Sequence, residues 1–300
     1  MKKNMKKRIP ALAVLVVLAL TPLLFYFAGC VIVPEQGVVV SGHNNQEFQR
    51  KAATCEPGSQ LLFTKETDEG LSPDNFSLIS WNSHRGTSYG WGEDLVALGG
   101  EVDIILLQEA ALDQVLNHQF NLFASEWLMA TAFQLDDQEI GILSAARVSP
   151  QGYCVSRKPE PLFRIPKVAL AVTYPLLGMD TRLLVVNIHL VNFTLNADAV
   201  RQQIEPLHEI IMNHQGPVIV AGDFNTWSNK REALVDEKMK ELQLQPVVFL
   251  PDKRVEFFNH KVDGVFYRGL EVTKSLSHQV ETSDHNPLEV HFKILTQEPS

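Results

Sequence analysis

The sequence predicts a domain in which β-strands alternate with α-helices, either an α/β or a layered α+β fold. Short apolar runs rich in β-branched residues, typical of buried strands, alternate with longer amphipathic stretches. Hydrophobic residues make up 45% of the 300-residue chain, and there are only 3 cysteines. This composition excludes a disordered chain and a disulfide-rich scaffold.

The N-terminus combines a basic segment, 1–8, with an uncharged apolar segment, 9–33. As a helix, residues 9–33 would be roughly 37 Å long, enough to cross a bilayer, so we expect one N-terminal transmembrane helix. The preceding cations predict inner-membrane anchoring with a cytoplasmic N-terminus and a periplasmic main domain; a cytoplasmic location is the alternative. The tetrapeptide 27–30 also resembles a bacterial lipobox, which leaves cleavage or lipidation at Cys30 open.

Residues 34–75 show little hydrophobic periodicity and contain turn signals at Pro57-Gly58 and Ser72-Pro73. We expect this segment to be a linker. It contains Cys55, which could pair with Cys154 in an oxidising compartment or stay free.

The main domain is expected over residues 76–295. Two helices are predicted there: one over Ala110 to Phe123, and one that starts at Asp198 and ends before Gly216-Pro217. The apolar runs that predict strands are Phe76 to Trp81, Val102 to Leu107, Val168 to Val172, Leu183 to Leu190, Val218 to Ala221, Val262 to Tyr267 and Leu288 to Phe292.

Charge is distributed unevenly along the chain. Five of the 26 basic residues precede residue 9, whereas all 35 acidic residues lie at or beyond Glu35. An acidic body repels polyphosphate, which argues against nucleic-acid binding driven by a broad basic field. Local basic pockets are not excluded.

Polar, chemically active residues lie in or next to the ends of several predicted strands. Strand ends at one edge of a sheet converge, and such a cluster is costly to bury unless its members are paired or bind a metal. Metal-assisted attack of water on a phosphate ester suits these residue types. The residues are Asn82, Glu109, His189, Asp223, Asn225, Asp263, Asp284 and His285.

The motifs that carry these residues resemble, in type and order, those of the endonuclease/exonuclease/phosphatase family. Among its members the chain looks most like the small bacterial YafD-like proteins. The resemblance covers about residues 76–293 and implies an α+β fold, a two-layer β-sandwich flanked by helices in four αββα layers, with the site at one sandwich edge. The motifs are Ser80-Trp81-Asn82, Leu107-Gln108-Glu109, Asn187-Ile188-His189-Leu190, Gly222-Asp223-Phe224-Asn225, Val262-Asp263 and Ser283-Asp284-His285.

The resemblance also implies a role for each residue. Glu109 would be the main ligand of Mg²⁺ (or Mn²⁺), with Asn82 beside it and Asp284 at the metal or water position. Asp223 would orient or deprotonate the attacking water.

The remaining three roles concern the phosphate and the leaving group. Asn225 would hold a phosphate oxygen, and His189 would face the leaving side. His285 would contact the scissile phosphate with Asp263 as its carboxylate partner. From the residues alone, Asp263 and His285 could instead form a structural pair, His189 could be a core histidine, and Glu109 could cap the following helix.

The chain departs from the family at His84, where many of the nucleases have an acid; this puts the second metal ligand and DNA-repair activity in doubt. The predicted function is a divalent-metal-dependent phosphoesterase, specifically a phosphodiesterase or nuclease. The alternatives are a phospholipid or small-molecule phosphatase, or a catalytically silent anchored module that binds a phosphate ligand. The expected partners are a phosphate-ester substrate (nucleic acid, phospholipid head group or small phosphodiester) and, through residues 9–33, a membrane.

Some further residues were assigned to ordinary structural positions. Arg147, Arg164 and Lys167 were expected in solvated loops, although each could contact phosphate. Trp91 and Trp227 were expected to pack in the core at least as readily as to stack on a base.

Overall fold

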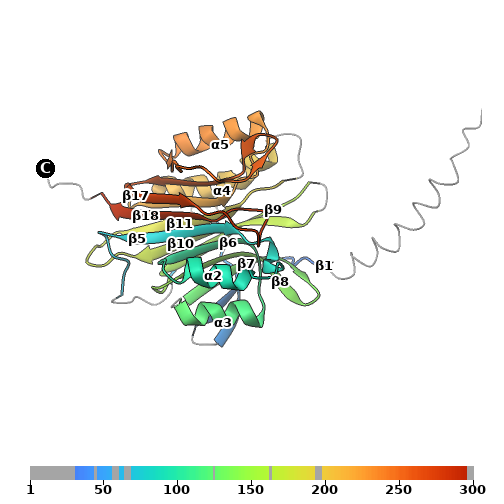
Figure 1. The fold of residues 1–300 in the computed structure, drawn as a ribbon. Helices are drawn as coiled ribbons and strands as arrows, with labels where there is room; N and C mark the ends of the chain where they lie inside the picture. Colours follow the sequence, from blue (N-terminus) through green and yellow to red (C-terminus); the bar gives the residue numbers. More distant parts are fainter. Residues whose placement is uncertain are drawn as a thin grey trace, which may run out of the picture.

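The computed structural model describes residues 31–43, 46–55, 61–63, 69–123, 126–161, 164–192 and 198–295. Two β-sheets pack face to face, and a pair of helices lies on the outer side of each (Figure 1). The expected four-layer αββα arrangement of an α+β sandwich is therefore confirmed for the described residues.

The first sheet has nine strands in the order β17-β18-β5-β6-β8-β7-β2-β3, with β1 also paired to β7. The neighbours β5 and β6 run parallel, whereas β6 and β8 run antiparallel, so the sheet is mixed. Its strands are β1 (Val31–Ile32), β2 (Val38–His43), β3 (Gln46–Lys51), β5 (Phe76–Asn82), β6 (Ile104–Ala111), β7 (Glu126–Leu135), β8 (Gln138–Ala146), β17 (Leu270–Ser277) and β18 (Leu288–Ile294).

The second sheet has seven strands in the order β13-β16-β12-β11-β10-β9-β4. Here β11 and β12 are the parallel neighbours. A separate hairpin, β14 (Glu256–Phe257) with β15 (His260–Lys261), lies outside both sheets. The strands of the second sheet are β4 (Leu62–Phe63), β9 (Gly152–Pro159), β10 (Pro166–Pro175), β11 (Arg182–His189), β12 (Val218–Asp223), β13 (Gln245–Pro246) and β16 (Asp263–Arg268).

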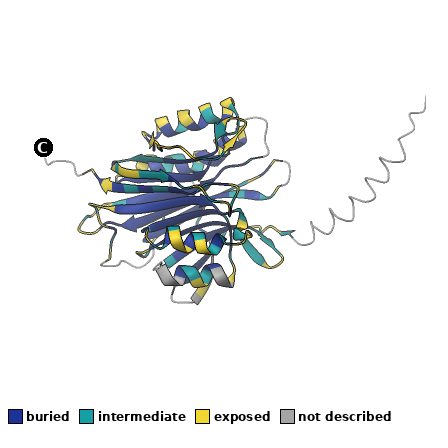
Figure 2. Ribbon diagram, viewed as in Figure 1, coloured by how far each residue is buried: buried dark blue, intermediate teal, exposed yellow. Residues whose placement is uncertain are grey.

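Apolar side chains fill both faces of the central strands. Leu78 and Leu106 belong to the core between the sheets, whereas Ile79 and Ile105 face the helices of the first sheet. Strands covered on both faces appear in a sequence as continuous apolar runs, which is why the sequence predicted them well. Figure 2 shows these strands as the most buried part of the molecule.

Four α-helices cover the sheets. The helix expected from Ala110 starts later, because residues 110–111 continue β6 and the Asp113 carboxylate accepts a hydrogen bond from the Leu116 N–H at 2.7 Å. The helices are α2 (Trp91–Gly99) and α3 (Gln114–Phe123) on the first sheet, and α4 (Asp198–Asn213) and α5 (Asn229–Glu241) on the second; a short 3₁₀ turn, η1, spans His84–Gly86.

The prediction that residues 34–75 form a linker is wrong for a large part of that segment. β2 pairs with β7, and β3 pairs with β2 at the edge of the first sheet. β3 exposes polar and charged side chains, as edge strands commonly do, and so lacks the apolar run that identifies a strand in a sequence. A disulfide between Cys55 and Cys154 joins the same segment to β9.

The predicted basic segment 1–8 and most of the predicted transmembrane helix 9–33 lie outside the described residues. The C-terminal end of that helix was placed too far along the chain, since Val31–Ile32 form β1 and pair with β7. None of the helices within the described ranges is long and apolar enough to cross a membrane.

Candidate active site

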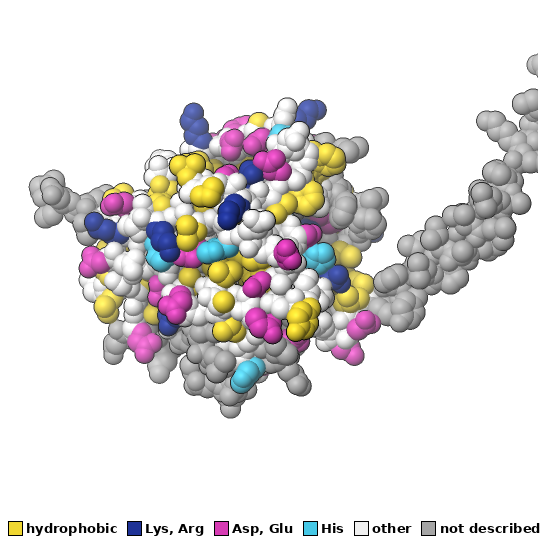
Figure 3. All heavy atoms as spheres, viewed as in Figure 1, with side chains coloured by type: hydrophobic (Ala, Val, Ile, Leu, Met, Phe, Trp, Pro, Cys, Tyr) yellow, Lys and Arg dark blue, Asp and Glu magenta, His cyan; other side chains and the backbone are white. Residues whose placement is uncertain are grey.

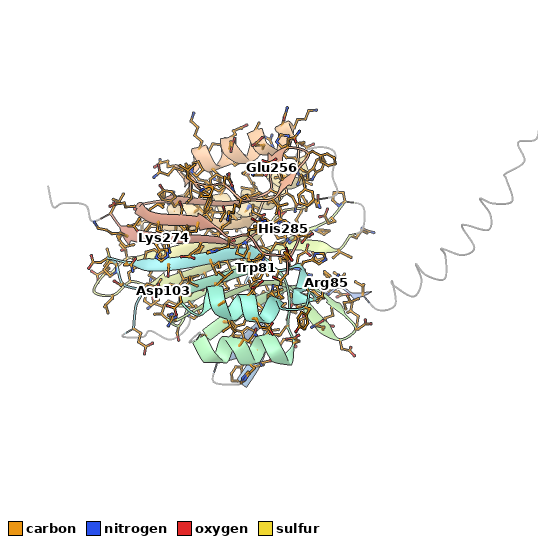
Figure 4. All side chains as sticks on the ribbon, in the orientation of Figure 1. Trp81, Arg85, Asp103, Glu256, Lys274 and His285 are labelled. Carbon is orange, nitrogen blue, oxygen red and sulfur yellow. A yellow bond between two sulfur atoms is a disulfide. The ribbon has the colours of Figure 1, made fainter. Side chains whose placement is uncertain are left out.

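The residues predicted to carry chemistry meet at one edge of the sandwich. They line a cleft of about 380 Å³, with the exception of Asp263, which lies directly behind His285. Figure 4 labels His285 and Trp81 close together in the middle of the molecule, where the indole Nε1–H of Trp81 donates to the His285 carbonyl at 3.0 Å. The predicted residues in the cleft are Asn82, Glu109, His189, Asp223, Asn225, Asp284 and His285.

The strand directions bring these residues together. β5 and β6 are parallel neighbours, so Asn82 and Glu109 lie at the same sheet edge. In the second sheet, His189 at the end of β11 lies opposite Asp223 of β12, and Asp223 lies opposite Asp263 of β16. The two clusters face each other because the sheets are stacked.

Glu109 enters the cleft through a local irregularity of β6. The register with β8 shifts between Leu107 and Ala110, and Glu109 has φ +50°. A bulge of this kind redirects a side chain. Because α3 begins only at Gln114, Glu109 is not in the first turn of that helix, and the alternative role as a helix cap is wrong.

Two buried amides beneath the cleft connect the sheets. Gln108 of β6 donates from Nε2 to Asn187 Oδ1 of β11 at 2.7 Å. The Nδ2 group of Asn187 donates in turn to the carbonyls of Leu107 and Leu143, at 3.2 and 2.8 Å. Since buried amides are costly unless they are paired, this network fixes the separation of the two sheets below the cleft.

The segment Gly222 to Asn225 is more than a turn. Gly222 and Asp223 end β12, and a Cβ on Gly222 would lie 2.0 Å from the Ile188 carbonyl oxygen, so this close strand approach requires glycine. Asn225 then adopts φ +48°, and its backbone N–H donates to Asp223 Oδ1 at 2.9 Å. The motif thus positions the Asp223 carboxylate.

Asp223, Asp263 and His285 form what we call the buried acid–imidazole group. His285 Nδ1–H donates to Asp263 Oδ2 at 2.7 Å, and His285 Nε2 lies 4.0 Å from Asp223 Oδ2. The Asn82 amide Nδ2 donates to Asp223 Oδ2 at 3.0 Å. Each of the three members is at most 7% exposed.

The pKa values of Asp223 and His285 are both raised, but for different reasons. Burial, followed by the Asp263 charge, raises the pKa of Asp223 to about 6. Burial by itself lowers the pKa of His285, but the carboxylates of Asp263, Asp223 and Asp284 outweigh it and raise this pKa to about 10. At neutral pH the group therefore holds an imidazolium next to an ionised Asp223.

His189 is a neutral imidazole that lines the cleft, not an inert core histidine. Burial, together with the charges of Lys167 and His285, lowers its pKa well below the ordinary value. The ammonium of Lys167 lies 2.8 Å from His189 Nε2 and, having no lone pair, can only donate to it. We therefore assign the ring proton of His189 to Nδ1.

The opposite side of the cleft is open to solvent. The side chain of Glu109 is 34% exposed, and its Oε1 lies 3.4 Å from Lys167 Nζ. His84 Nδ1 pairs with Asp284 Oδ1 at 2.9 Å, so the residue that departs from the family pattern contacts a predicted site residue. The backbone N–H of His84 also donates to Asn82 Oδ1 at 3.2 Å.

The donor atoms on this open side suit a hard divalent cation. Glu109 and Asp284 offer exposed carboxylate oxygens, and the buried Asn82 beside them offers an amide oxygen; these are the ligands that Mg²⁺ prefers, and solvent can supply water ligands. Within the described residues, one group of three acids and histidines has its ligand atoms within 4.8 Å of one another. Its members are Asp223, Asp263 and His285. A cation there would compete with the Nδ1 proton that Asp263 stabilises, so Glu109 is the better candidate ligand.

Several residues of the cleft were missed or misjudged from the sequence. Lys167 was expected in a solvated loop, but it lies on β10 and contacts both His189 and Glu109. Trp227 lines the cleft, and its Nε1–H donates to Asn192 Oδ1 at 2.8 Å. Neither residue belongs to a motif, and the sequence contains no separate signal for either of them.

Other residues support the cleft without lining it. Arg231, which is buried, donates from Nε to the Asn225 carbonyl at 2.6 Å and holds that loop in place. Trp91 packs against Trp81 in the core, with ring centroids 5.5 Å apart. Arg147 donates to the Val102 carbonyl at 2.9 Å, a structural contact.

Charges of both signs are interspersed over the described surface in the view of Figure 3. That face carries no continuous basic band in its described part, which agrees with the acidic balance of the sequence. The cations that matter for an anionic ligand are therefore those at the cleft itself.

Comparison with known proteins identifies relatives in sequence and in fold. A UPF0294 protein of Vibrio cholerae is 34% identical over 264 residues, which covers 88% of this chain and 91% of the relative. The human Nocturnin catalytic domain with bound sulfate superposes with a TM-score of 0.56 at 17% identity, covering 76% of this chain and 97% of that one.

A second solved structure, an endonuclease/exonuclease/phosphatase from Beutenbergia cavernae, gives a TM-score of 0.54 at 17% identity and covers 74% of this chain and 72% of that one. At such identities the two structures support the fold alone. The family profile matches over residues 79–285, which include every predicted site residue. The chain belongs to the Endonuclease/Exonuclease/phosphatase family.

Proposed function

We propose that this protein is a divalent-metal-dependent phosphoesterase that hydrolyses a phosphodiester by in-line attack of an activated water. One observation carries the proposal: Asp223 and His285 of the buried acid–imidazole group line a single cleft with the open carboxylate of Glu109, and Asp263 backs His285. Membership of a family of nucleases and phosphatases supports the reaction class. The sulfate bound to the Nocturnin structure supports recognition of a tetrahedral oxyanion by this fold.

Asp223 is the residue best placed to accept the proton of the attacking water. Its raised pKa, about 6, leaves it ionised at neutral pH and still basic enough to take a proton. Asn82 and the backbone of Asn225 hold its two oxygens in place, at 3.0 and 2.9 Å. The carboxylate is thus oriented before the substrate arrives.

His285 supplies positive charge for the phosphoryl oxygens. Its Nδ1 is held by Asp263, so Nε2–H is the proton that faces the cleft. A fixed donor of this kind stabilises the charge that develops in the transition state. Asp263 is a positioning residue in this scheme, since it acts through His285.

Lys167 lies at the other end of the cleft, between His189 and Glu109. We assign this end to the leaving side. The Lys167 ammonium, next to neutral His189, offers a positive charge to the departing oxygen.

The proposed role of Asn225 is to bind a phosphate oxygen. Its Nδ2 group donates one hydrogen bond among the described residues, to the Leu190 carbonyl at 2.8 Å, so a second N–H is left for the phosphate.

Glu109, Asn82 and Asp284 are the residues that would hold Mg²⁺ or Mn²⁺. When bound, the metal polarises a phosphoryl oxygen as a Lewis acid. Asp284, the third of these proposed ligands, pairs with His84, the residue at which this chain differs from many nucleases of the family.

The test is hydrolysis by the full-length protein of a chromogenic phosphodiester, single-stranded and duplex DNA, RNA and phospholipids. We expect turnover of at least one of them with Mg²⁺ or Mn²⁺ and none with a chelator. Glu109→Ala and His285→Ala should abolish it. The absence of metal-dependent turnover, or full activity in both variants, would refute the proposal.

A second candidate is an anchored module that binds a phosphate ligand without turnover. The observation that favours it is His84, whose pairing with Asp284 occupies one carboxylate oxygen of the open side. Calorimetry with a phosphodiester analogue separates the two candidates. Tight binding with no hydrolysis would favour the module.

We also propose that the catalytic domain faces the periplasm, tethered to the inner membrane by residues 9–33. The basic segment 1–8 supports this orientation, and the Cys55–Cys154 disulfide supports an oxidising compartment. Alkaline phosphatase fused to the C-terminus should be active in cells. An inactive phosphatase fusion would place the domain in the cytoplasm.

A further inference from the structure

A second hollow, of about 260 Å³, adjoins the catalytic cleft. Glu109 and His189 line both spaces, so the two are continuous at the leaving side of the cleft. The hollow lies between the sheets: Phe133 and Ile140 come from the β7–β8 hairpin, and Ile165 lies just before β10 on the other sheet. We call this hollow the apolar subsite.

The walls of the apolar subsite are aliphatic or aromatic except where it meets the cleft. At that junction lie two cations, Lys167 and Arg85. Arg85 belongs to η1, is exposed, and has no hydrogen bond or ion pair with another described residue. Two acids also line the hollow: Glu109, which it shares with the cleft, and Glu160, which accepts a hydrogen bond from the Asn192 N–H at 2.5 Å.

This arrangement fits a ligand with an anionic end and a hydrocarbon end. The anionic phosphate would lie in the cleft beside the two cations, and the hydrocarbon would enter the apolar subsite. The lining contains no hydroxyl or amide side chain among its described residues. A nucleobase edge would find hydrogen-bond partners only in the charged residues and His189, and none along the apolar walls.

The path of the N-terminal segment provides an independent argument. β1 lies at the C-terminal end of the apolar segment 9–33 and pairs with β7 at Leu135 and Gln134, next to Phe133 of the subsite wall. Arg157 holds this junction, donating to the carbonyls of Pro34 and Ala132 at 3.0 and 3.2 Å, and Ala132 also lines the subsite.

The same side of the molecule presents apolar residues to the solvent. Ile32 and Val33 are 52% and 41% exposed at the point where the chain leaves β1. Figure 4 places Arg85 toward the side on which β1 lies in Figure 1. If the apolar residues that precede β1 are anchored in a bilayer, as proposed above, β1 brings that anchor to the side of the domain that carries the subsite.

We propose that the apolar subsite binds the hydrocarbon chain of a lipid phosphodiester, so that the substrate of this protein is a membrane phospholipid. This inference rests on the proposed phosphodiesterase function, and it adds the substrate class. Burying one methylene is worth about 0.8 kcal/mol, which corresponds to about a fourfold gain in kcat/KM for each carbon that enters the subsite.

The experiment measures kcat/KM for p-nitrophenyl phosphodiesters that differ only in the second ester: methyl, propyl or hexyl. The full-length protein is held in vesicles of an uncharged galactolipid, which contains no phosphate, with Mg²⁺ present. We expect the hexyl ester to exceed the methyl ester by at least about 30-fold, since most of the added carbons become buried. Thymidine 5′-p-nitrophenyl phosphate serves as the nucleotide probe.

Variants separate binding in the subsite from partition into the vesicle. Ile165→Trp fills the hollow, and Ile165→Asn makes its wall polar; each should lower the hexyl-to-methyl ratio at least tenfold. Ile210, on α4, is likewise half-buried but distant in the fold, so Ile210→Trp is the matched control and should keep the wild-type ratio. Thermal unfolding of each variant verifies that it is folded.

Each outcome has a defined meaning. Equal kcat/KM for all three esters would overturn the subsite and leave the phosphodiesterase intact, as would an unchanged ratio in both Ile165 variants. A thymidine ester hydrolysed tenfold faster than the hexyl ester would overturn it in favour of a nucleic-acid substrate. No turnover of any probe would refute the phosphodiesterase proposal itself.

Discussion

The buried half of the cleft and its open half are built in different ways. On the buried side, Asp223 and His285 are 2% and 7% exposed and are held by hydrogen bonds to side chains and backbone. On the open side, the side chains of His84, Glu109 and Asp284 are 44%, 34% and 54% exposed. The first region is fixed by the fold, whereas the second is in contact with solvent.

This difference indicates a division of labour. Charges in a water-excluded environment interact strongly and need no reorganisation during a reaction, which suits proton transfer and oxyanion stabilisation. Exposed oxygen ligands exchange readily with water, which suits reversible binding of a hydrated cation. The following variants test whether the two halves have these separate roles.

The largest expected effect is on the buried side. Asp223→Asn removes the proton acceptor while keeping the shape of the side chain, and kcat should fall by about 10²- to 10⁴-fold. Steady-state kinetics over a range of Mg²⁺ concentrations should show that no amount of metal restores the rate. Recovery of the rate at high Mg²⁺ would assign Asp223 to metal binding, and the two halves of the cleft would then not have separate roles.

Glu109→Gln should show the opposite pattern. Loss of one carboxylate charge weakens cation binding, so kcat/KM at low Mg²⁺ should fall by roughly 10²-fold and recover in part as the metal is raised. A metal titration of the rate measures this, with Glu101→Gln, an exposed acid remote from the motifs, as the matched control. A loss that is independent of metal concentration would contradict the assignment.

The pH dependence follows from the buried group. Activity requires ionised Asp223 and protonated His285, so kcat/KM should rise with pH through about 6 and fall again near 10. In Asp263→Asn the charge that raises both pKa values is gone, and both limbs should therefore move to lower pH. A pH profile of the two proteins measures the shift, and limbs that move in opposite directions would be incompatible with this group.

The smallest effect is expected for His84→Ala. Ion pairs between exposed side chains contribute about 0–1 kcal/mol to stability, and the His84–Asp284 pair is of that kind. We expect less than about a fivefold change in kcat/KM and an almost unchanged unfolding midpoint in urea. A loss as large as that of His285→Ala would make the open half as essential to the chemistry as the buried half.

Much of the fold and most of the site could be predicted from the sequence because the relevant signals are local. Central strands such as β5 and β12 are buried on both faces and appear as apolar runs, and each predicted polar residue lies in or near the end of such a run. The prediction failed at the edge of the first sheet. The outer strand β3 exposes polar side chains, which makes it resemble a linker in the sequence.

The parts of the site that escaped prediction depend on contacts between segments that are distant in the sequence. Lys167 gains its role only because β10 lies beside β11, and no spacing in the sequence contains that information. The Cys55–Cys154 disulfide likewise could be named but not decided from the sequence, since the two residues are 99 positions apart. Contacts of this kind depend on the complete topology.

The left-handed backbone conformation of Glu109 affects stability and activity in opposite directions. At φ +50°, a side chain costs energy that glycine would not, roughly 1 kcal/mol. Glu109→Gly should thus unfold at a higher temperature than the natural protein while losing its activity. A screen for thermostability and a screen for turnover would select opposite residues at this one position, and a stabilised library that enriches glycine there would mark the site without any assay of its substrate.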